Sequence, residues 1–221
     1  MVLYFDITKV ATARHLSGLT RVSENLRQSI EKQWSGNFVP VIWNKKKRYF
    51  SRLHTRDPTR FSSQDCFVTP EVFSSNERPG FYECLKNSQV RNAAIFHDSI
   101  PLKHPEIIWP KSVERHPQYM EDLLQFNDVF SVSAASQEDL ENYWKSLGKE
   151  KFPSLHVLQL GADFFDRSTV KWDYQPVSPP LVLCIGIIEP RKNQKEVLKV
   201  ALQLWEAGTV SYTHLTLPTK A

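Results

Sequence analysis

Glycine is scarce in this sequence, with 7 glycines among 221 residues. Globular proteins average about 7% glycine, so collagen-like, linker-like and glycine-repeat classes are excluded. Cysteine is also rare: the three cysteines lie far apart, are odd in number and form no CxxC pair. This pattern argues against a disulfide framework and against a cysteine-based metal or redox motif. We therefore expect reduced thiols in a cytosolic setting.

Long apolar runs and targeting signals are missing too. The longest apolar run covers residues 181–188 and contains a glycine, whereas a transmembrane helix needs about 20 apolar residues. The N-terminus, MVLYFDITKV, lacks the basic region and cleavage site of a signal peptide. With 41% hydrophobic and 24% charged residues, the chain has the composition of a folded globular protein rather than a disordered one. We expect it to be cytoplasmic.

Positive charge is concentrated in one segment. The formal net charge is +4, and four consecutive cations, Lys45, Lys46, Lys47 and Arg48, begin a basic stretch that extends to residue 60. We expect this stretch to be a loop, and most such runs are simply solvated surface. Its field would also suit the anionic inner face of a membrane, RNA or an acidic glycan. No nucleic-acid-binding motif accompanies it, so nucleic acid is not expected as a partner.

Short apolar segments alternate with amphipathic ones, which predicts a doubly wound α/β fold. Ser17 and Ser136 are the expected caps of two helices, and Pro40 places the second strand at a sheet edge. The expected strands cover residues 2–7, 38–43, 65–68, 92–96, 128–133, 155–160 and 181–187, and the expected helices residues 19–30, 81–86, 117–126, 137–147 and 194–207.

Prolines determine two further expectations. Pro101, Pro105 and Pro110 predict an irregular stretch, and Pro117 is expected in the first turn of a helix. The segment QPVSPP predicts a linker between two domains. The expected organisation is a Rossmann-like domain over residues 1–163, a linker over 164–180 and the first strand and helix of a second Rossmann-like domain over 181–208. One strand and one helix cannot bury a core alone, so we expect this second domain to be truncated.

Two loops follow strands of the first domain, where α/β proteins bind ligands. Gly18, at the start of a helix, would let a phosphate approach the backbone NH groups. The simpler interpretation is an ordinary turn that uses the freedom of glycine. His97 ends another strand and could handle a proton or a sugar hydroxyl, while Asp98 could orient its ring or stabilise the loop. The alternative is a His-Asp pair that only closes a turn.

A third loop joins the strand and helix of the second domain. Arg191 could hold phosphate oxygens bidentately, and Lys192 adds a point charge, so the pair would suit a diphosphate. The alternative is a solvated basic turn. The sequence has no GxGxxG fingerprint, P-loop, GxSxG elbow, HExxH or metal-ligand spacing, so no specific dehydrogenase, NTPase, hydrolase or metal-site motif supports those classes.

Five segments in order, SGLTRVSENL, IFHDSIPLKHPE, FSVSAASQEDL, LQLGADF and LCIGIIEPRKN, resemble the group 1 glycosyltransferases of the GT-B class. The resemblance implies two Rossmann-like domains around a cleft for a nucleotide-diphosphate sugar. That sugar is a co-substrate, so no cofactor and no metal are implied, and the acceptor is a glycan or a lipid-linked sugar. The family usually retains the anomeric configuration.

The resemblance also implies roles for single residues. Gly18 would face the donor diphosphate, His97 and Asp98 would lie beside the reacting sugar, and Arg191 and Lys192 would neutralise the leaving group. Gly161 and Asp163 would mark the hinge between the domains. Two features depart from the family pattern: Thr20 stands where many relatives have a second glycine, and the two donor-binding glutamates of the family are absent.

The sequence thus favours the acceptor half of a cytoplasmic glycosyltransferase of polysaccharide or lipopolysaccharide biosynthesis. One alternative is a basic module that binds nucleic-acid or membrane phosphates, and another is a GT-B-type epimerase or phosphorylase. Residues 209–221, TVSYTHLTLPTKA, do not continue the family pattern and resemble a translated sequencing adapter. We expect native sequence to end near Gly208 and the present chain to be inactive alone, the alternative being a genuine short protein with a disordered tail.

Overall fold

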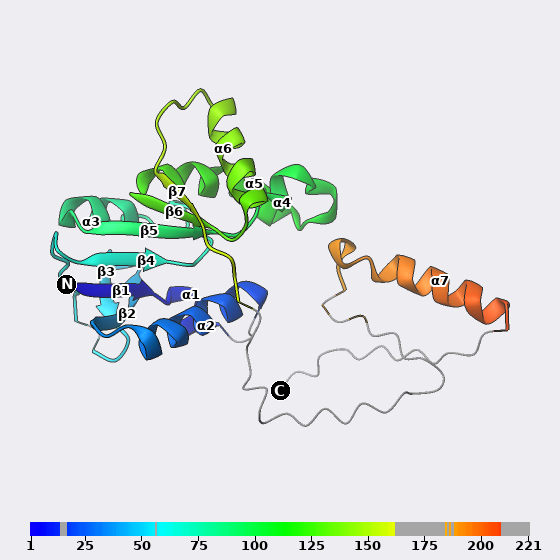
Figure 1. Cartoon of the computed structure of the whole chain (residues 1–221), viewed down its shortest axis with the longest axis horizontal. Coiled ribbons are helices and arrows are strands. Elements are labelled where there is room, and N and C mark those ends of the chain that lie inside the picture. Colours follow the sequence, from blue (N-terminus) through cyan, green and yellow to red (C-terminus); the bar gives the residue numbers. More distant parts are fainter. Residues whose placement is uncertain (14–16, 56, 162–183, 185, 187, 209–221) are drawn as a thin grey trace.

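The computed structural model describes residues 1–13, 17–55, 57–161, 184, 186 and 188–208 (Figure 1). It is an α/β structure with a seven-stranded sheet of order β3-β2-β1-β4-β5-β6-β7. Every neighbouring pair is parallel except β2 and β3. This confirms the expected α/β class and is compatible with a Rossmann-like fold. The strands are β1 (Val2–Asp6), β2 (Asn37–Asn44), β3 (Tyr49–Arg52), β4 (Cys66–Thr69), β5 (Arg91–Phe96), β6 (Asp128–Ser131) and β7 (Ser154–Val157).

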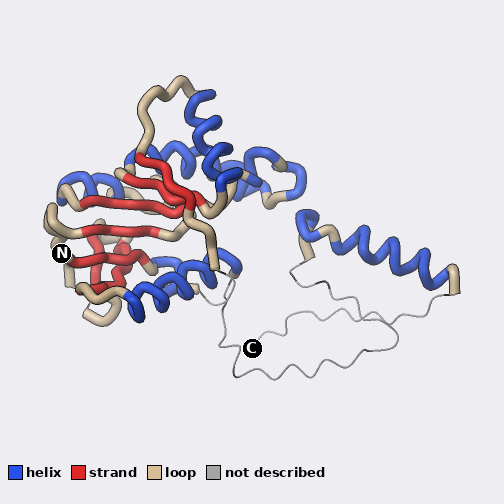
Figure 2. Tube along the Cα trace, in the orientation of Figure 1, coloured by secondary structure: helices blue, strands red, loops and turns tan. Residues whose placement is uncertain are grey.

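Helices pack on both sides of the sheet (Figure 2). At least one helix lies between the strands of each consecutive parallel pair, β1 and β2, β4 and β5, β5 and β6, and β6 and β7, because parallel strands need a crossover connection. No helix of the described residues is long and apolar enough to cross a membrane. The α-helices are α1 (Thr8–Thr12), α2 (Gly18–Gln33), α3 (Phe81–Ser88), α4 (Ile100–Lys103), α5 (Pro110–Asp122), α6 (Ala134–Ser146) and α7 (Gln194–Glu206), and short 3₁₀ turns cover Pro105–Ile107, Leu123–Gln125 and Pro190–Lys192.

The core between the sheet and α3 is largely aromatic, which explains the abundance of Phe in the sequence. Phe81 begins α3 and lies 4.7 Å from the ring of Phe73 and 5.2 Å from that of Phe50, measured between centroids. Trp144 of α6 is fully buried, and its indole NH donates to the carbonyl of Met120 at 2.8 Å. Edge-to-face ring packing adds about 0.5–1.5 kcal/mol per pair beyond area burial.

The prediction that Pro40 marks an edge strand is wrong. β2 pairs with β1 on one side and with β3 on the other, and Pro40 lies opposite Phe5 of β1. The carbonyl of Val41 accepts from Ile7 of the β1 side, so the Pro40 nitrogen points the opposite way. The ladder with β3 begins only at Val41, so proline deprives neither neighbour of a hydrogen bond.

The basic segment is not the irregular loop that was expected. Its four cations form the exposed turn of a β-hairpin, and the residues after them form strand β3, the edge of the sheet. Lys47 donates its backbone NH to the Asn44 side chain, and Arg48 donates to the Asn44 carbonyl at 2.7 Å. Aromatic residues at the start of β3 make this strand half-buried, a feature that the surrounding charge concealed in the sequence.

Two expectations for proline need correction. The stretch from Pro101 to Pro110 is helical rather than irregular, because these prolines occupy first-turn positions, where the missing NH would be unpaired anyway. Helix α5 therefore starts at Pro110, and Pro117 lies inside it instead of at its first turn. Pro117 has no NH to donate to the preceding turn, and tertiary packing of the helix tolerates this loss.

The expected cap of α6 is displaced by three residues. Ser133 is the N-cap, and its Oγ accepts from the backbone NH of Ser136 at 3.1 Å. Ser136 instead donates its hydroxyl to the carbonyl of His97 at 2.9 Å. Glu138 and Asp139 lie beyond the first turn, where Asp139 accepts from Ser99 at 2.6 Å. The hydroxyl of Ser136 therefore connects α6 to the end of β5.

Helix α1 was not predicted. The other predicted elements that the structure describes agree with it to within a few residues, including the Ser17 cap of α2 and helix α7. The predicted strand over residues 181–187 and the linker over 164–180 lie outside the described residues, apart from residues 184 and 186. Helix α7 buries none of its residues, and five of its apolar side chains are exposed: Val197, Leu198, Val200, Leu202 and Leu204.

Gly80 precedes α3 and has φ = +83°, a left-handed conformation that other residues adopt at a cost. A Cβ at this position would lie 3.0 Å from Cδ of Arg48. We expect Gly80→Ala to lower the free energy of unfolding by about 1–2 kcal/mol. Urea unfolding measures the loss, with Gly148→Ala (φ = +70°, no neighbouring atom within 4 Å) separating backbone strain from contact with Arg48. If Gly80→Ala leaves the free energy of unfolding unchanged, the prediction is wrong.

Candidate functional site

The order in which the strands are added to the sheet reverses between β1 and β4. From β1 the chain crosses to β2 on one side, and β4 then pairs with β1 on the other side. Loops after two such strands leave a crevice at their carboxyl ends, which is where open α/β sheets bind ligands. Because β5 and β6 continue the parallel sheet, their carboxyl ends extend the same edge.

A buried ionic cluster fills the base of this switch point. Asp6 ends β1, Glu71 follows β4, and Arg78 comes from the loop before α3. Nη1 of Arg78 lies 2.5 Å from Oδ2 of Asp6, and its Nη2 pairs with Oε2 of Glu71. The Arg78 side chain is 5% exposed, and its guanidinium lies 3.8 Å over the ring centroid of Phe73. Thr69 completes the cluster by donating its hydroxyl to Asp6 at 2.8 Å.

The two carboxylates of the cluster also hold helix α1. Oδ1 of Asp6 accepts from the backbone NH of Thr8 at 3.0 Å and from its hydroxyl at 2.6 Å. Oε1 of Glu71 accepts from the backbone NH groups of Lys9 at 2.5 Å and Val10 at 3.3 Å. Helix α1 has no side-chain cap of its own at Ile7. The cluster therefore takes the place of a cap and fixes the chain that leads from β1 toward Gly18.

The charges of this cluster do not balance, since one guanidinium faces two buried carboxylates. Burial, together with repulsion from Asp6, raises the pKa of Glu71 to about 7. Nearby, burial lowers the pKa of Lys9, whose Nζ donates to the carbonyl of Val72 and lies 3.8 Å from Glu77. Perturbed groups gathered at a strand-end crevice mark a functional-site candidate, although buried ion-pair networks produce the same shifts.

Gly18 is the first residue of α2 and is exposed. The hydroxyl of Ser17 accepts from the backbone NH of Thr20 at 3.2 Å. No atom lies within 4 Å of where a Cβ on Gly18 would stand. The start of α2 is therefore open, as an approaching phosphate would require, but the structure shows no steric need for glycine here.

His97 directly follows β5 and is buried, with 6% of its surface exposed. Its Nε2 lies 3.0 Å from the carbonyl oxygen of Pro70, and because a carbonyl can only accept, Nε2 carries the proton. Burial lowers the pKa of His97, so the ring is neutral at pH 7. The ring contributes to packing and to the contact between the ends of β4 and β5, in addition to any chemical role.

Asp98 does not orient the His97 ring. Its Oδ1 accepts from the backbone NH of Ile100 at 3.0 Å and so starts α4. Its carbonyl accepts from Nε2 of His116 at 3.0 Å, and burial lowers the pKa of that histidine. Of the two roles considered for Asp98, the structure shows the stabilisation of the loop.

The remaining predicted residues lie after β7 in the chain. Arg191 and Lys192 are exposed in the 3₁₀ turn before α7, and Nη2 of Arg191 lies 2.5 Å from Oε1 of Glu189. Gly161 is exposed after β7, and no atom lies within 4 Å of the position that a Cβ would take there. Asp163 lies outside the described residues.

Sequence reasoning missed Asp6, Glu71 and Arg78. Asp6 and Glu71 each follow an apolar strand closely, which is a usable signal for a site at strand ends. Arg78 lies in a loop among ordinary polar residues, so nothing in the sequence distinguishes it. Within the described ranges, no three His, Cys, Asp or Glu side chains are grouped as metal ligands would be.

The open start of α2 at Gly18, the ring of His97 and the cluster around Arg78 thus all lie in segments that follow the carboxyl ends of β1, β4 and β5. Arg191 and Lys192 belong to a separate turn beyond β7. Comparisons of the chain with protein-family models, with curated proteins and with solved structures find no match.

Proposed function

We propose that the chain is the acceptor-binding domain, with the start of the donor-binding domain, of a GT-B-class glycosyltransferase of the group 1 type. The supporting observation is that Gly18 and His97, which come from separate family-like segments, lie on the same carboxyl edge of a mainly parallel sheet. The donor is a nucleotide-diphosphate sugar and the acceptor a glycan or a lipid-linked sugar. No metal takes part.

The residues have distinct tasks in this proposal. The departing nucleoside diphosphate gains negative charge, which the guanidinium of Arg191 and the ammonium of Lys192 stabilise from fixed positions. In this proposal the NH groups at the start of α2, next to Gly18, add positive potential on the side of the diphosphate opposite Arg191 and Lys192. His97 is neutral with its proton on Nε2, so Nδ1 is left as a hydrogen-bond acceptor for a sugar hydroxyl.

The turn between β2 and β3 indicates where a lipid-linked acceptor would approach the protein. Lys45, Lys46, Lys47 and Arg48 are exposed at the carboxyl end of β2, on the same edge of the sheet as Gly18. Clustered cations beside an anionic membrane each contribute about 1 kcal/mol of attraction. A peripheral contact of this kind at the inner face of a membrane would place the sheet edge beside a lipid-linked sugar.

Binding of a nucleoside diphosphate tests the proposal. In saturation-transfer NMR with the 221-residue chain, we expect millimolar UDP or GDP to receive magnetisation, because Gly18, Arg191 and Lys192 are all present. The double variant Arg191→Ala/Lys192→Ala should weaken binding at least tenfold, since charged hydrogen bonds contribute about 1.5–3 kcal/mol each. The control Lys195→Ala/Lys199→Ala removes the same charge from exposed positions of α7 and should leave binding unchanged.

The outcomes separate the alternatives. No signal from UDP, GDP or ADP, or equal losses in the two double variants, would contradict the proposal. Binding of polyanions with no nucleotide specificity would favour the basic phosphate-binding module. If a nucleotide sugar binds, product analysis distinguishes transfer to an acceptor from epimerisation of the sugar and from phosphorolysis of a glycan.

A further inference from the structure

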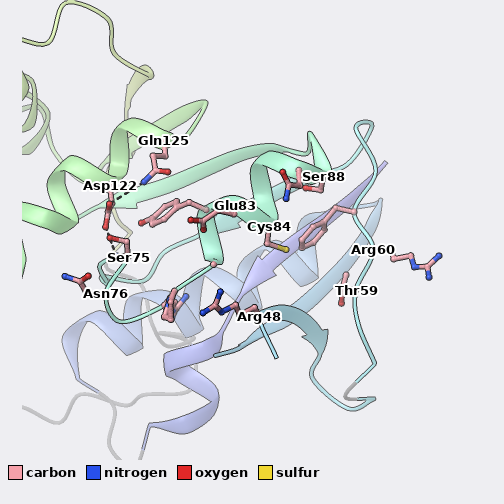
Figure 3. Close-up of a pocket in the computed structure, with 16 residues that line it drawn as sticks. Arg48, Thr59, Arg60, Ser75, Asn76, Glu83, Cys84, Ser88, Asp122 and Gln125 are labelled. Atoms are coloured by element: carbon pink, nitrogen blue, oxygen red, sulfur yellow. Dashed lines mark hydrogen bonds between the residues drawn. The ribbon is translucent and has the colours of Figure 1, made fainter. Parts of the chain in front are cut away.

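A hollow of about 960 Å³ lies beside α3 (Figure 3), and its lining includes none of the residues proposed above to bind the nucleotide sugar. The loop from Ser75 to Gly80 and the hairpin residue Arg48 line one part of it. The segment from Thr59 to Phe61 and the last turn of α3 line another part. The hollow is therefore built from the β2–β3 hairpin, the loop after β3, the loop before α3, α3 itself, and Asp122 and Gln125 at and after the end of α5.

The hairpin turn holds Arg48 at this hollow in a constrained backbone conformation. Arg48 closes the turn with φ = +56°, a left-handed conformation that is uncommon for arginine. Its side-chain stem packs against Gly80, where an added Cβ would approach Cδ of Arg48 to 3.0 Å. The stem is thus held by packing, while the guanidinium makes no ion pair or hydrogen bond with the residues that the structure describes.

Arg60 supplies a second cation at the far part of the hollow. Its side chain is exposed and extends outward in Figure 3, and no described residue pairs with it. Beside it, Oγ1 of Thr59 is buried and has no hydrogen-bond partner among the described residues. The lining also contains two acids, the exposed Glu83 and the buried Asp122.

The rest of the lining is polar rather than aromatic. Asn76 and Asn87 expose amide groups, which both donate and accept hydrogen bonds. Tyr82 is buried and Phe61 is partly buried, so few ring faces are open for stacking. Amides suit sugar hydroxyls, and guanidinium groups suit carboxylates or phosphates. Sites for single-stranded nucleic acid also use exposed aromatic rings on which bases stack, and a bilayer surface does not enter a hollow.

We propose that this hollow binds an acidic oligosaccharide, with Arg48 and Arg60 receiving successive negative groups of one sugar chain. Asn76 and Asn87 receive hydroxyls of the same chain. The site rests on residues that the proposed nucleotide site does not use, so either assignment can fail without the other.

Isothermal titration calorimetry of the 221-residue chain tests this site, with hexagalacturonate as the acidic probe and maltohexaose as its neutral counterpart. We expect hexagalacturonate to bind at least tenfold more tightly in physiological salt. Arg48→Gln/Arg60→Gln should weaken its binding at least tenfold. Lys45→Gln/Lys46→Gln removes the same charge from the same hairpin outside the hollow, and it should change binding less than threefold. Glu83→Gln should tighten binding twofold or more.

Circular dichroism confirms that each variant is folded, and Glu83→Gln tests the site even if the arginine pair is unstable. Absence of hexagalacturonate binding would overturn the proposal, as would equal losses in the arginine and lysine variants or no gain in Glu83→Gln. Arginine-dependent binding of vesicles with 30% phosphatidylglycerol, or of a twelve-residue oligothymidine, without hexagalacturonate binding would assign the hollow to a membrane or a nucleic acid instead.

Discussion

Replacing Arg78 with methionine is expected to lower the free energy of unfolding by about 3–5 kcal/mol, the usual effect of removing one partner from a buried ion pair. The guanidinium is the only cation in contact with both Asp6 and Glu71 within the described structure, and both carboxylates are almost fully buried. Without it, two negative charges face each other in a medium of low dielectric constant. Urea unfolding at pH 8, followed by circular dichroism, measures the loss.

Arg115→Met is the matched control for this measurement. Arg115 also pairs with a carboxylate, Glu77, at 3.2 Å, but both side chains are partly exposed. Its loss should therefore be below about 1 kcal/mol. The triple variant Arg78→Met/Asp6→Asn/Glu71→Gln removes the uncompensated charges and should recover part of the stability. Similar losses for Arg78→Met and Arg115→Met would show that the cluster does not stabilise the switch point.

The second large effect is a dependence of stability on pH at Glu71. Its pKa rises to about 7 in the folded protein from 4.5 in a free side chain, so the folded state favours the protonated form. Below pH 4.5 Glu71 is protonated in both states and has no ionisation cost. As the pH rises from 4.5 through 7, the folded protein must bury the charge, and stability falls by up to about 3 kcal/mol.

Comparison with Glu71→Gln isolates this contribution. His97 and His116 have lowered pKa values because they are buried, so their contribution is lost as the pH falls below about 6.5 and opposes that of Glu71. The glutamine variant keeps both histidines. The unfolding free energy of Glu71→Gln minus that of the wild type should therefore increase between about pH 4.5 and 7.5 and then level off. A flat difference would contradict the raised pKa of Glu71.

The sequence predicted most of the fold because its strands and helices carry strong local signals. The apolar run before Asp6, the Ser17 cap and the periodic apolar face of α2 all act within a few residues. Local signals failed where packing reversed them. Pro40 lies in an internal strand because its nitrogen points away from β1, and Pro117 lies inside a helix because that helix starts earlier, at Pro110.

The candidate site divides in the same way. The position of Gly18 and His97 at the carboxyl edge was predicted from the sequence, because the residues that follow a strand in an α/β fold belong to that edge. Glu71 and Arg78 were missed, since their importance depends on meeting Asp6, 65 and 72 positions earlier in the chain. Arg48 likewise became a candidate only in the structure, where the hairpin turn places its side chain against Gly80. The sequence by itself determined the elements and the edge at which polar loops meet. Only the tertiary structure decided which charges are buried together, because the desolvation that makes those charges consequential exists only once distant segments pack.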